Sequence, residues 1–133
     1  MGIPDKIALE SGPVFQPAFN EDGLIPAIAS DHDTGTVLMV AWMNQTALDM
    51  TLRTNVAHFW SRSRAKLWRK GEESGNTLEI VEMRTDCDQD VIWLRVRMKG
   101  DGKACHTGRT SCFYRRIEHN ADGGIALVDV GDD

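Results

Sequence analysis

Long hydrophobic runs are missing from this chain of 133 residues. The longest run, VLMVAWM at 37–43, is far shorter than the roughly 20 apolar residues that a membrane-spanning helix needs. The N-terminus also lacks the basic start, apolar stretch and small-residue cleavage site of a secretion signal. These absences argue against a membrane or secreted protein and predict a cytoplasmic one.

The chain also lacks an excess of positive charge. It has 15 Lys and Arg residues and 20 Asp and Glu residues, which gives a net charge of −5. This balance argues against non-specific binding to nucleic acid, although a local basic patch could still attract an anionic small molecule. The apolar share of 41% and the charged share of 26% are typical of a folded globular chain. A chain of this length predicts one domain over residues 1–133.

Cysteine is scarce, and the C-x-x-C pairs that mark most structural zinc sites are absent. Cys87, Cys105 and Cys112 are spaced 18 and 7 positions apart. In a reducing cytosol the simplest interpretation is three unpaired thiols packed as small hydrophobic groups. Three thiolates with an open fourth position are instead the ligands of a catalytic zinc, whereas His106, beside Cys105, could close the shell and make the zinc structural. Spacing leaves these alternatives open.

The hydrophobic patterns predict an α+β fold, mostly antiparallel β-sheet with one or two short helices. Asn44 is a good N-cap and Asn55 a plausible stop for a helix near 45–54. Strict alternation of apolar and polar residues marks 91–98 as a strand with one buried face. The remaining strands are expected at 24–30, 37–43, 57–61, 78–85, 112–118 and 125–130.

The stretch DCDQD at 86–90 places aspartates at alternate positions around a cysteine. In an extended segment Asp86, Asp88 and Asp90 would project to one side and Cys87 to the other. Convergent carboxylates are hard ligands suited to Mg²⁺ or Ca²⁺, while a thiolate suits zinc. A solvated acidic turn between two strands is the ordinary alternative.

A basic segment, SRSRAKLWRKGEESGN at 61–76, holds five of the fifteen basic residues within nine positions. A hydroxyl follows at Ser74, a free backbone at Gly75 and a side-chain amide at Asn76. All of these groups contact phosphate oxygens readily. Trp68 lies among the charges, where an indole can stack on a base. A solvated basic loop is the competing interpretation.

Taken together, FWSRSRAKLWRKGEESGN, MRTDCDQD and ACHTGRTSCFYRR resemble the signature blocks of the phosphoribosyl-AMP cyclohydrolase family of histidine biosynthesis. The resemblance runs in order over about residues 38–118. It implies an intertwined homodimer that uses zinc and magnesium and opens the adenine ring of phosphoribosyl-AMP across its N1–C6 bond. Some relatives carry a C-terminal pyrophosphohydrolase domain, which this chain is expected to lack.

The resemblance also implies roles for individual residues. Cys87 of one subunit would share zinc with Cys105 and Cys112 of the other, and Asp86, Asp88 and Asp90 would hold magnesium. His106 is our candidate for general acid–base catalysis. The residues implied in substrate binding are Arg62, Ser63, Arg64, Trp68, Lys70, Gly71, Glu72, Ser74, Gly75 and Asn76.

Two alternatives remain, of which the first belongs to a different functional class. One is a small module with a structural zinc, closed by His106, that binds an anionic partner without turnover. The other is a zinc hydrolase acting on a different purine nucleotide, but the H-x-E and P-C-x-x-C signature of nucleobase deaminases is missing.

Overall fold

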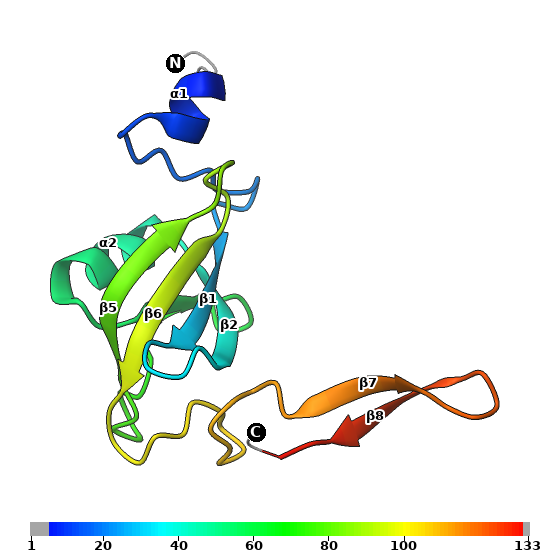
Figure 1. Ribbon diagram of the computed structural model, residues 1–133. Coiled ribbons are helices and arrows are strands. Elements are labelled where there is room, and N and C mark those ends of the chain that lie inside the picture. Colours follow the sequence, from blue (N-terminus) through cyan, green and yellow to red (C-terminus); the bar gives the residue numbers. More distant parts are fainter. Residues whose placement is uncertain (1–5, 132–133) are drawn as a thin grey trace.

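The computed structural model describes residues 6–131 and consists of a compact sheet body with a helical N-terminal end and a projecting C-terminal hairpin (Figure 1). In chain order the elements are α1 Lys6–Ser11, β1 Ile25–Asp31, β2 Val37–Met43, α2 Gln45–Thr54, β3 His58–Ser61, β4 Lys66–Arg69, β5 Leu78–Thr85, β6 Ile92–Met98, β7 Arg115–His119 and β8 Ile125–Asp129.

The body is a curled six-stranded sheet in the order β4-β3-β2-β1-β6-β5. All neighbouring strands are antiparallel except β1 and β6, which pair in parallel from Ala27↔Ile92 to Asp31↔Val96. The predicted α+β class with a mostly antiparallel sheet is therefore confirmed. The parallel pair was not predicted, because it joins strands separated by some sixty residues and no local turn signals it.

The predicted alternation in β6 is confirmed, since Ile92, Leu94 and Val96 are almost fully buried. They join a single core with residues from every part of the sheet, including Phe59 and Leu78. Each fully buried side chain of this size contributes about 1.5–3 kcal/mol of hydrophobic stabilisation. The core therefore fixes the sheet, and the loops at its edges are positioned by it.

Helix α2 has the predicted ends. The Asn44 side chain accepts a hydrogen bond from the Ala47 N–H at 2.8 Å, and Asn55 closes the helix in the left-handed region. Thr51 ties the helix to β3, because its hydroxyl donates to the Ala47 carbonyl and accepts from the His58 N–H. His58 is buried, and its ring lies 2.8 Å from the Val56 carbonyl, as expected of a packed histidine.

Most predicted strands agree with the structure to within one residue, but two segments differ by more. No strand was predicted within the basic segment at 61–76, yet Lys66–Arg69 forms β4 and pairs with β3 from His58↔Arg69 to Ser61↔Lys66. The strand expected from residue 112 begins at Arg115. At Cys112 the chain is still bound to the body, since its N–H donates to the Leu38 carbonyl at 2.7 Å.

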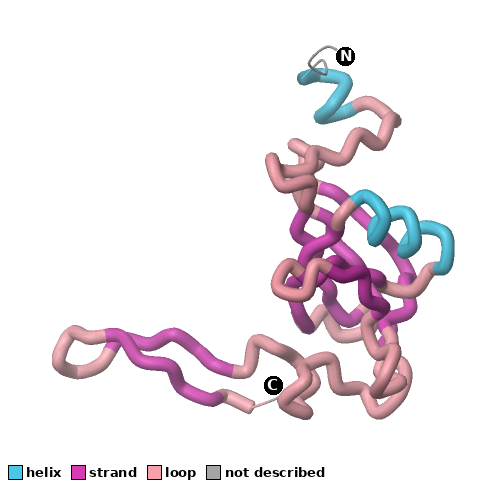
Figure 2. The backbone as a smooth tube through the Cα atoms, turned by 180° about the vertical axis from the view of Figure 1, so that it is seen from behind, coloured by secondary structure: helices cyan, strands magenta, loops and turns pink. Residues whose placement is uncertain are grey.

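Strands β7 and β8 form a separate two-stranded sheet that extends away from the body (Figures 1 and 2). We call residues 115–129 the arm. Ile117 lies opposite Leu127, and both side chains are more than half exposed, as is Ile125 nearby. Within residues 6–131, no helix combines the length and apolarity needed to cross a membrane.

Candidate functional site

A cavity of about 1060 Å³ opens at the β3–β4 edge of the sheet and is bounded by the loops that follow β4 and β6. It brings together most of the predicted substrate-binding residues with one predicted zinc ligand, Cys105, and with His106. Its lining consists of Ala41, Trp42, Trp60, Ser61, Arg62, Ser63, Arg64, Lys66, Trp68, Arg69, Lys70, Gly71, Glu72, Glu73, Ser74, Asn76, Asp101, Lys103, Cys105, His106 and Gly108.

The walls combine cations with indole rings. The Arg62 guanidinium lies over the Trp42 ring, 5.0 Å from its centroid, and Trp68 packs against Phe59 with ring centroids 5.2 Å apart. Guanidinium groups bind phosphates in a bidentate manner, and indoles stack on flat ring systems. The cavity therefore suits an anionic ligand that carries an aromatic ring.

Part of this lining was not predicted from the sequence. Trp42 and Trp60 were not singled out from the sequence, yet they lie opposite each other on β2 and β3 and both line the cavity. Asp101 and Lys103 come from the loop after β6, where no motif marked them. The one sequence feature that could have indicated a role for these tryptophans is the group of basic residues on the neighbouring β3–β4 hairpin.

Asn76 joins two walls of the cavity, because its side-chain oxygen accepts a hydrogen bond from the Asp101 N–H at 2.9 Å. Gly71 and Gly100 make this approach possible. Both have positive φ, and a Cβ on either would collide with Asn76. Gly75 also has positive φ but does not line the cavity. Its backbone conformation belongs to the turn that leads to Asn76.

The Cys105 and Cys112 thiols contact each other, and no disulfide joins them. Burial opposes ionisation of Cys105, but hydrogen bonding to Thr107 and Cys112 and the nearby Lys70 together lower its pKa. The Thr107 hydroxyl lies 3.0 Å from the Cys105 sulfur. Desolvation and the neighbouring Cys105 raise the pKa of Cys112 to about 11. Cys105 is thus the more acidic of the two thiols, and a bound cation would favour ionisation of Cys112.

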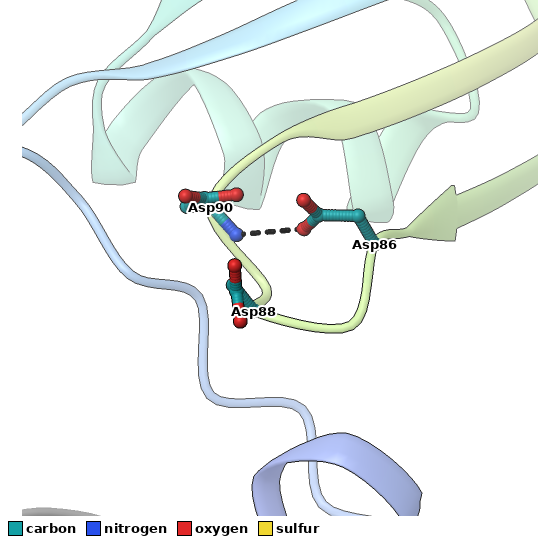
Figure 3. Close-up of side chains that lie close together, drawn as sticks. All are labelled: Asp86, Asp88 and Asp90. Carbon is teal, nitrogen blue, oxygen red and sulfur yellow. Dashed lines mark hydrogen bonds between the residues drawn. The ribbon is translucent and has the colours of Figure 1, made fainter. Parts of the chain in front are cut away.

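Asp86, Asp88 and Asp90 present carboxylate oxygens that all lie within 4.8 Å of one another (Figure 3). The expected extended geometry is wrong, because residues 86–90 form a turn in which the Asp90 N–H donates to the Asp86 carboxylate at 3.0 Å. A side-chain hydrogen bond with Asp86, desolvation and repulsion from Asp86 and Asp88 raise the pKa of Asp90. Crowded hard oxygens of this kind fit a divalent cation such as Mg²⁺.

Cys87 does not lie with the other two thiols. It belongs to the turn between β5 and β6, whereas Cys105 and Cys112 follow the far end of β6 (Figure 1). The seven residues of β6 separate these ends by about 20 Å at the usual rise of an extended strand. The three predicted zinc ligands of one chain therefore cannot bind the same ion.

Comparisons with a family model and with individual relatives point to the same family. The sequence model of the family described as phosphoribosyl-AMP cyclohydrolase matches residues 39–114. A protein named phosphoribosyl-AMP cyclohydrolase from Brucella anthropi is 56% identical over 129 residues, which cover 96% of this chain and 92% of the relative. Proteins of the same name from Brucella canis and Mesorhizobium japonicum are also 56% identical, over 96% and 98% of this chain and 91% and 88% of their own lengths.

Proposed function

The chain belongs to the phosphoribosyl-AMP cyclohydrolase family, and on this basis we propose that it hydrolyses the N1–C6 bond of the adenine ring of phosphoribosyl-AMP. The product is the formimino-carboxamide ribonucleotide intermediate of histidine biosynthesis. The observation that carries the proposal is the cavity in which the basic, indole-rich lining meets Cys105 and His106. A cytoplasmic location is part of the same proposal.

The cavity lining accounts for substrate binding. Its volume of about 1060 Å³ is at the upper end of small-molecule sites and has room for a nucleotide with two phosphates. Arg62, Arg64 and Lys70 neutralise one phosphate, and Trp68 provides an aromatic face for the purine. The other contacts in this proposal come from Ser63, Gly71, Glu72, Ser74 and Asn76, with Gly75 shaping the loop.

Cys105 and Cys112 form two thirds of the proposed zinc site, and Cys87 of a second subunit completes it. When bound there, zinc supplies a water acidified toward neutral pH. His106 lines the cavity beside Cys105 and is exposed, so its ring is accessible to a bound substrate. In this proposal His106 accepts the proton released as oxygen attacks C6 and returns a proton to N1 as the ring opens.

Asp86, Asp88 and Asp90 form the proposed magnesium site, which neutralises substrate phosphate when occupied. These carboxylates lie in the same turn as Cys87, at the end of β6 away from the cavity of their own chain. One contact between subunits would therefore bring both a zinc ligand and the acidic turn to the cavity of the partner. This common placement supports a shared site.

The arm supports the homodimer. One face of the β7–β8 hairpin presents Ile117, Ile125 and Leu127 to solvent, and a two-stranded hairpin is marginally stable without a cover. A second copy of the chain, with its own arm in return, would bury these side chains. The result would be the intertwined homodimer of a single-domain protein.

The proposal is tested by adding phosphoribosyl-AMP to the purified protein and following the purine ultraviolet spectrum. We expect ring opening, loss of turnover after chelation, and recovery when zinc is added back. Binding of the nucleotide by fully metallated protein with no spectral change would overturn the proposal and favour a structural-zinc module.

A further inference from the structure

Gln89 is the one residue of the acidic turn at 86–90 that is buried, with 4% of its surface exposed. It lies between the exposed residues Asp88 and Asp90. Its backbone has φ of 55°, in the left-handed region that non-glycine residues adopt rarely. A buried amide in an uncommon conformation, in the middle of three carboxylates, requires a specific set of contacts to hold it there.

Those contacts come from the other end of the sequence, from residues 9–18, which we call the N-terminal strap. The Gln89 side-chain oxygen accepts a hydrogen bond from the Gln16 N–H at 2.6 Å, and its amide nitrogen donates to the Leu9 carbonyl at 2.9 Å. The Gln89 carbonyl accepts from the Ala18 N–H at 2.7 Å. Gln89 thus fastens the strap with both its side chain and its backbone (Figure 3 shows this segment, in blue, passing the turn).

Within the turn, two further hydrogen bonds lead from Gln89 and its neighbour to Asp86. The Gln89 N–H donates to the Asp86 carbonyl and the Asp90 N–H donates to the Asp86 carboxylate, both at 3.0 Å. Mutual repulsion of three carboxylates within 4.8 Å works against this geometry. The strap acts in the opposite direction, because its hydrogen bonds hold Gln89 in the conformation that closes the turn.

We propose that Gln89 is a positioning residue that couples binding of a divalent cation at Asp86, Asp88 and Asp90 to docking of the N-terminal strap. The inference rests on the magnesium site of the proposed function and adds a residue that is not a ligand. Coupling of this kind is reciprocal: the cation tightens the strap by the same factor by which the strap tightens cation binding.

The test uses the full chain with Gln89→Met, which keeps the length of the side chain and removes its hydrogen bonds. Gln16→Met is the matched control, since Gln16 contributes its backbone N–H and not its side chain to the contact. Gln89→Gly is a second variant that also relieves the positive φ, in case the methionine variant is unstable. Calorimetric titration with Mg²⁺ measures cation binding, and amide hydrogen exchange at Gln16 and Ala18 measures strap docking.

We expect Mg²⁺ to slow exchange at both amides in the unmodified protein and in Gln16→Met. In the Gln89 variants the cation should bind about fivefold more weakly or worse, the lower end of coupling between linked sites, and should no longer alter exchange. Faster exchange with unchanged Mg²⁺ affinity in these variants would overturn the inference and leave the magnesium site intact. If the unmodified protein binds no Mg²⁺, or Asp88→Asn binds it equally well, the magnesium site itself is wrong and the inference falls with it.

Discussion

The side-chain oxygen of Asn76 accepts a hydrogen bond from the backbone N–H of Asp101 across 25 positions of sequence. This bond joins the basic loop after β4 to the loop that leads from β6 to Cys105. Together with the backbone bond from the Lys99 N–H to the Thr77 carbonyl, this side chain positions the two walls of the cavity relative to each other. The distance between the proposed substrate-binding loop and the proposed zinc ligand therefore depends partly on Asn76.

We therefore expect Asn76→Ala to lower kcat/KM for phosphoribosyl-AMP by about 2- to 12-fold, corresponding to one lost hydrogen bond of roughly 0.5–1.5 kcal/mol. Asn76→Asp keeps an acceptor for the Asp101 N–H and should retain more of the activity. Steady-state kinetics of the two variants measure this difference. Equal losses in both would indicate that Asn76 acts through its amide nitrogen on the substrate and not by joining the loops.

The separation of Cys87 from Cys105 along β6 leads to a prediction about mixed dimers. Cys87→Ala and Cys105→Ala homodimers should each be inactive, because each damages both shared sites. Random exchange of subunits should restore up to about a quarter of the unmodified activity. The reason is that a mixed dimer, with one subunit of each variant, contains one intact site and one doubly damaged site. Mass spectrometry of intact dimers verifies the exchange. Verified exchange with no return of activity would exclude a zinc site shared between subunits.

The pair of thiols predicts unequal reactivity in the metal-free protein. The pKa of Cys105 is lowered and that of Cys112 is raised to about 11 by desolvation and by Cys105. Although Cys112 is exposed, we expect its alkylation by iodoacetamide to be slow near pH 8 and to accelerate until the pH reaches about 11. Peptide mass spectrometry over a pH series measures the rate.

Cys105→Ser provides the control for this experiment. Without the neighbouring thiolate the pKa of Cys112 should fall, so Cys112 should react faster at pH 8 than in the unmodified protein. A Cys112 rate at pH 8 equal to that of an ordinary exposed thiol, with no effect of Cys105→Ser, would contradict the predicted coupling.

How far the sequence alone predicts the molecule depends on the range of the interactions involved. Helix α2 and strand β6 were predicted because capping at Asn44 and alternation from Ile92 are local signals. The parallel pairing of β1 with β6 and the turn around Gln89 were not, because both depend on contacts between distant segments.

The same distinction applies to the site. The basic residues from Arg62 to Lys70 and the three aspartates form local clusters, so their grouping was readable from the sequence. The meeting of Trp42 with the basic hairpin, and the approach of Asn76 to Asp101, arise only when the sheet has folded. The distance of Cys87 from the other thiols follows from the direction of β6, whereas sharing between subunits came from the family resemblance.

Acidification should weaken magnesium binding at the turn. The pKa of Asp90 is raised by its hydrogen bond with Asp86, by desolvation and by repulsion from Asp86 and Asp88. Protons and the cation compete for the same carboxylate, so the affinity for Mg²⁺ is highest with Asp90 ionised and falls as the pH drops. Because its pKa is raised, the fall should begin above the pH at which an ordinary aspartate, with a pKa of about 3.9, titrates.

Calorimetric titrations with Mg²⁺ at a series of pH values measure this dependence, and Asp90→Asn serves as the comparison. The variant should bind Mg²⁺ more weakly at neutral pH and lose less affinity on acidification, because the group that gains the proton is gone. An affinity that stays constant down to about pH 4 in the unmodified protein would exclude Asp90 as a ligand.

The exposed apolar face of the arm predicts where the dimer can be broken. Ile117 is 73% exposed and lies opposite Leu127, which is 55% exposed, whereas Glu118 lies on the other face of the same hairpin. Ile117→Lys would place an ammonium group in the proposed interface, and we expect it to convert the dimer into monomers and thereby to abolish turnover.

Glu118→Lys introduces the same side chain on the opposite face and should leave the dimer and its turnover unchanged. It removes only the surface ion pair between Glu118 and Arg116, and such pairs contribute about 0–1 kcal/mol. Sedimentation velocity measures the oligomeric state, and the spectroscopic assay measures turnover on the same samples. Since the cavity of one chain contains Cys105 but not Cys87, activity should follow the dimer fraction. A fully active monomeric Ile117→Lys variant would show that one chain suffices for catalysis.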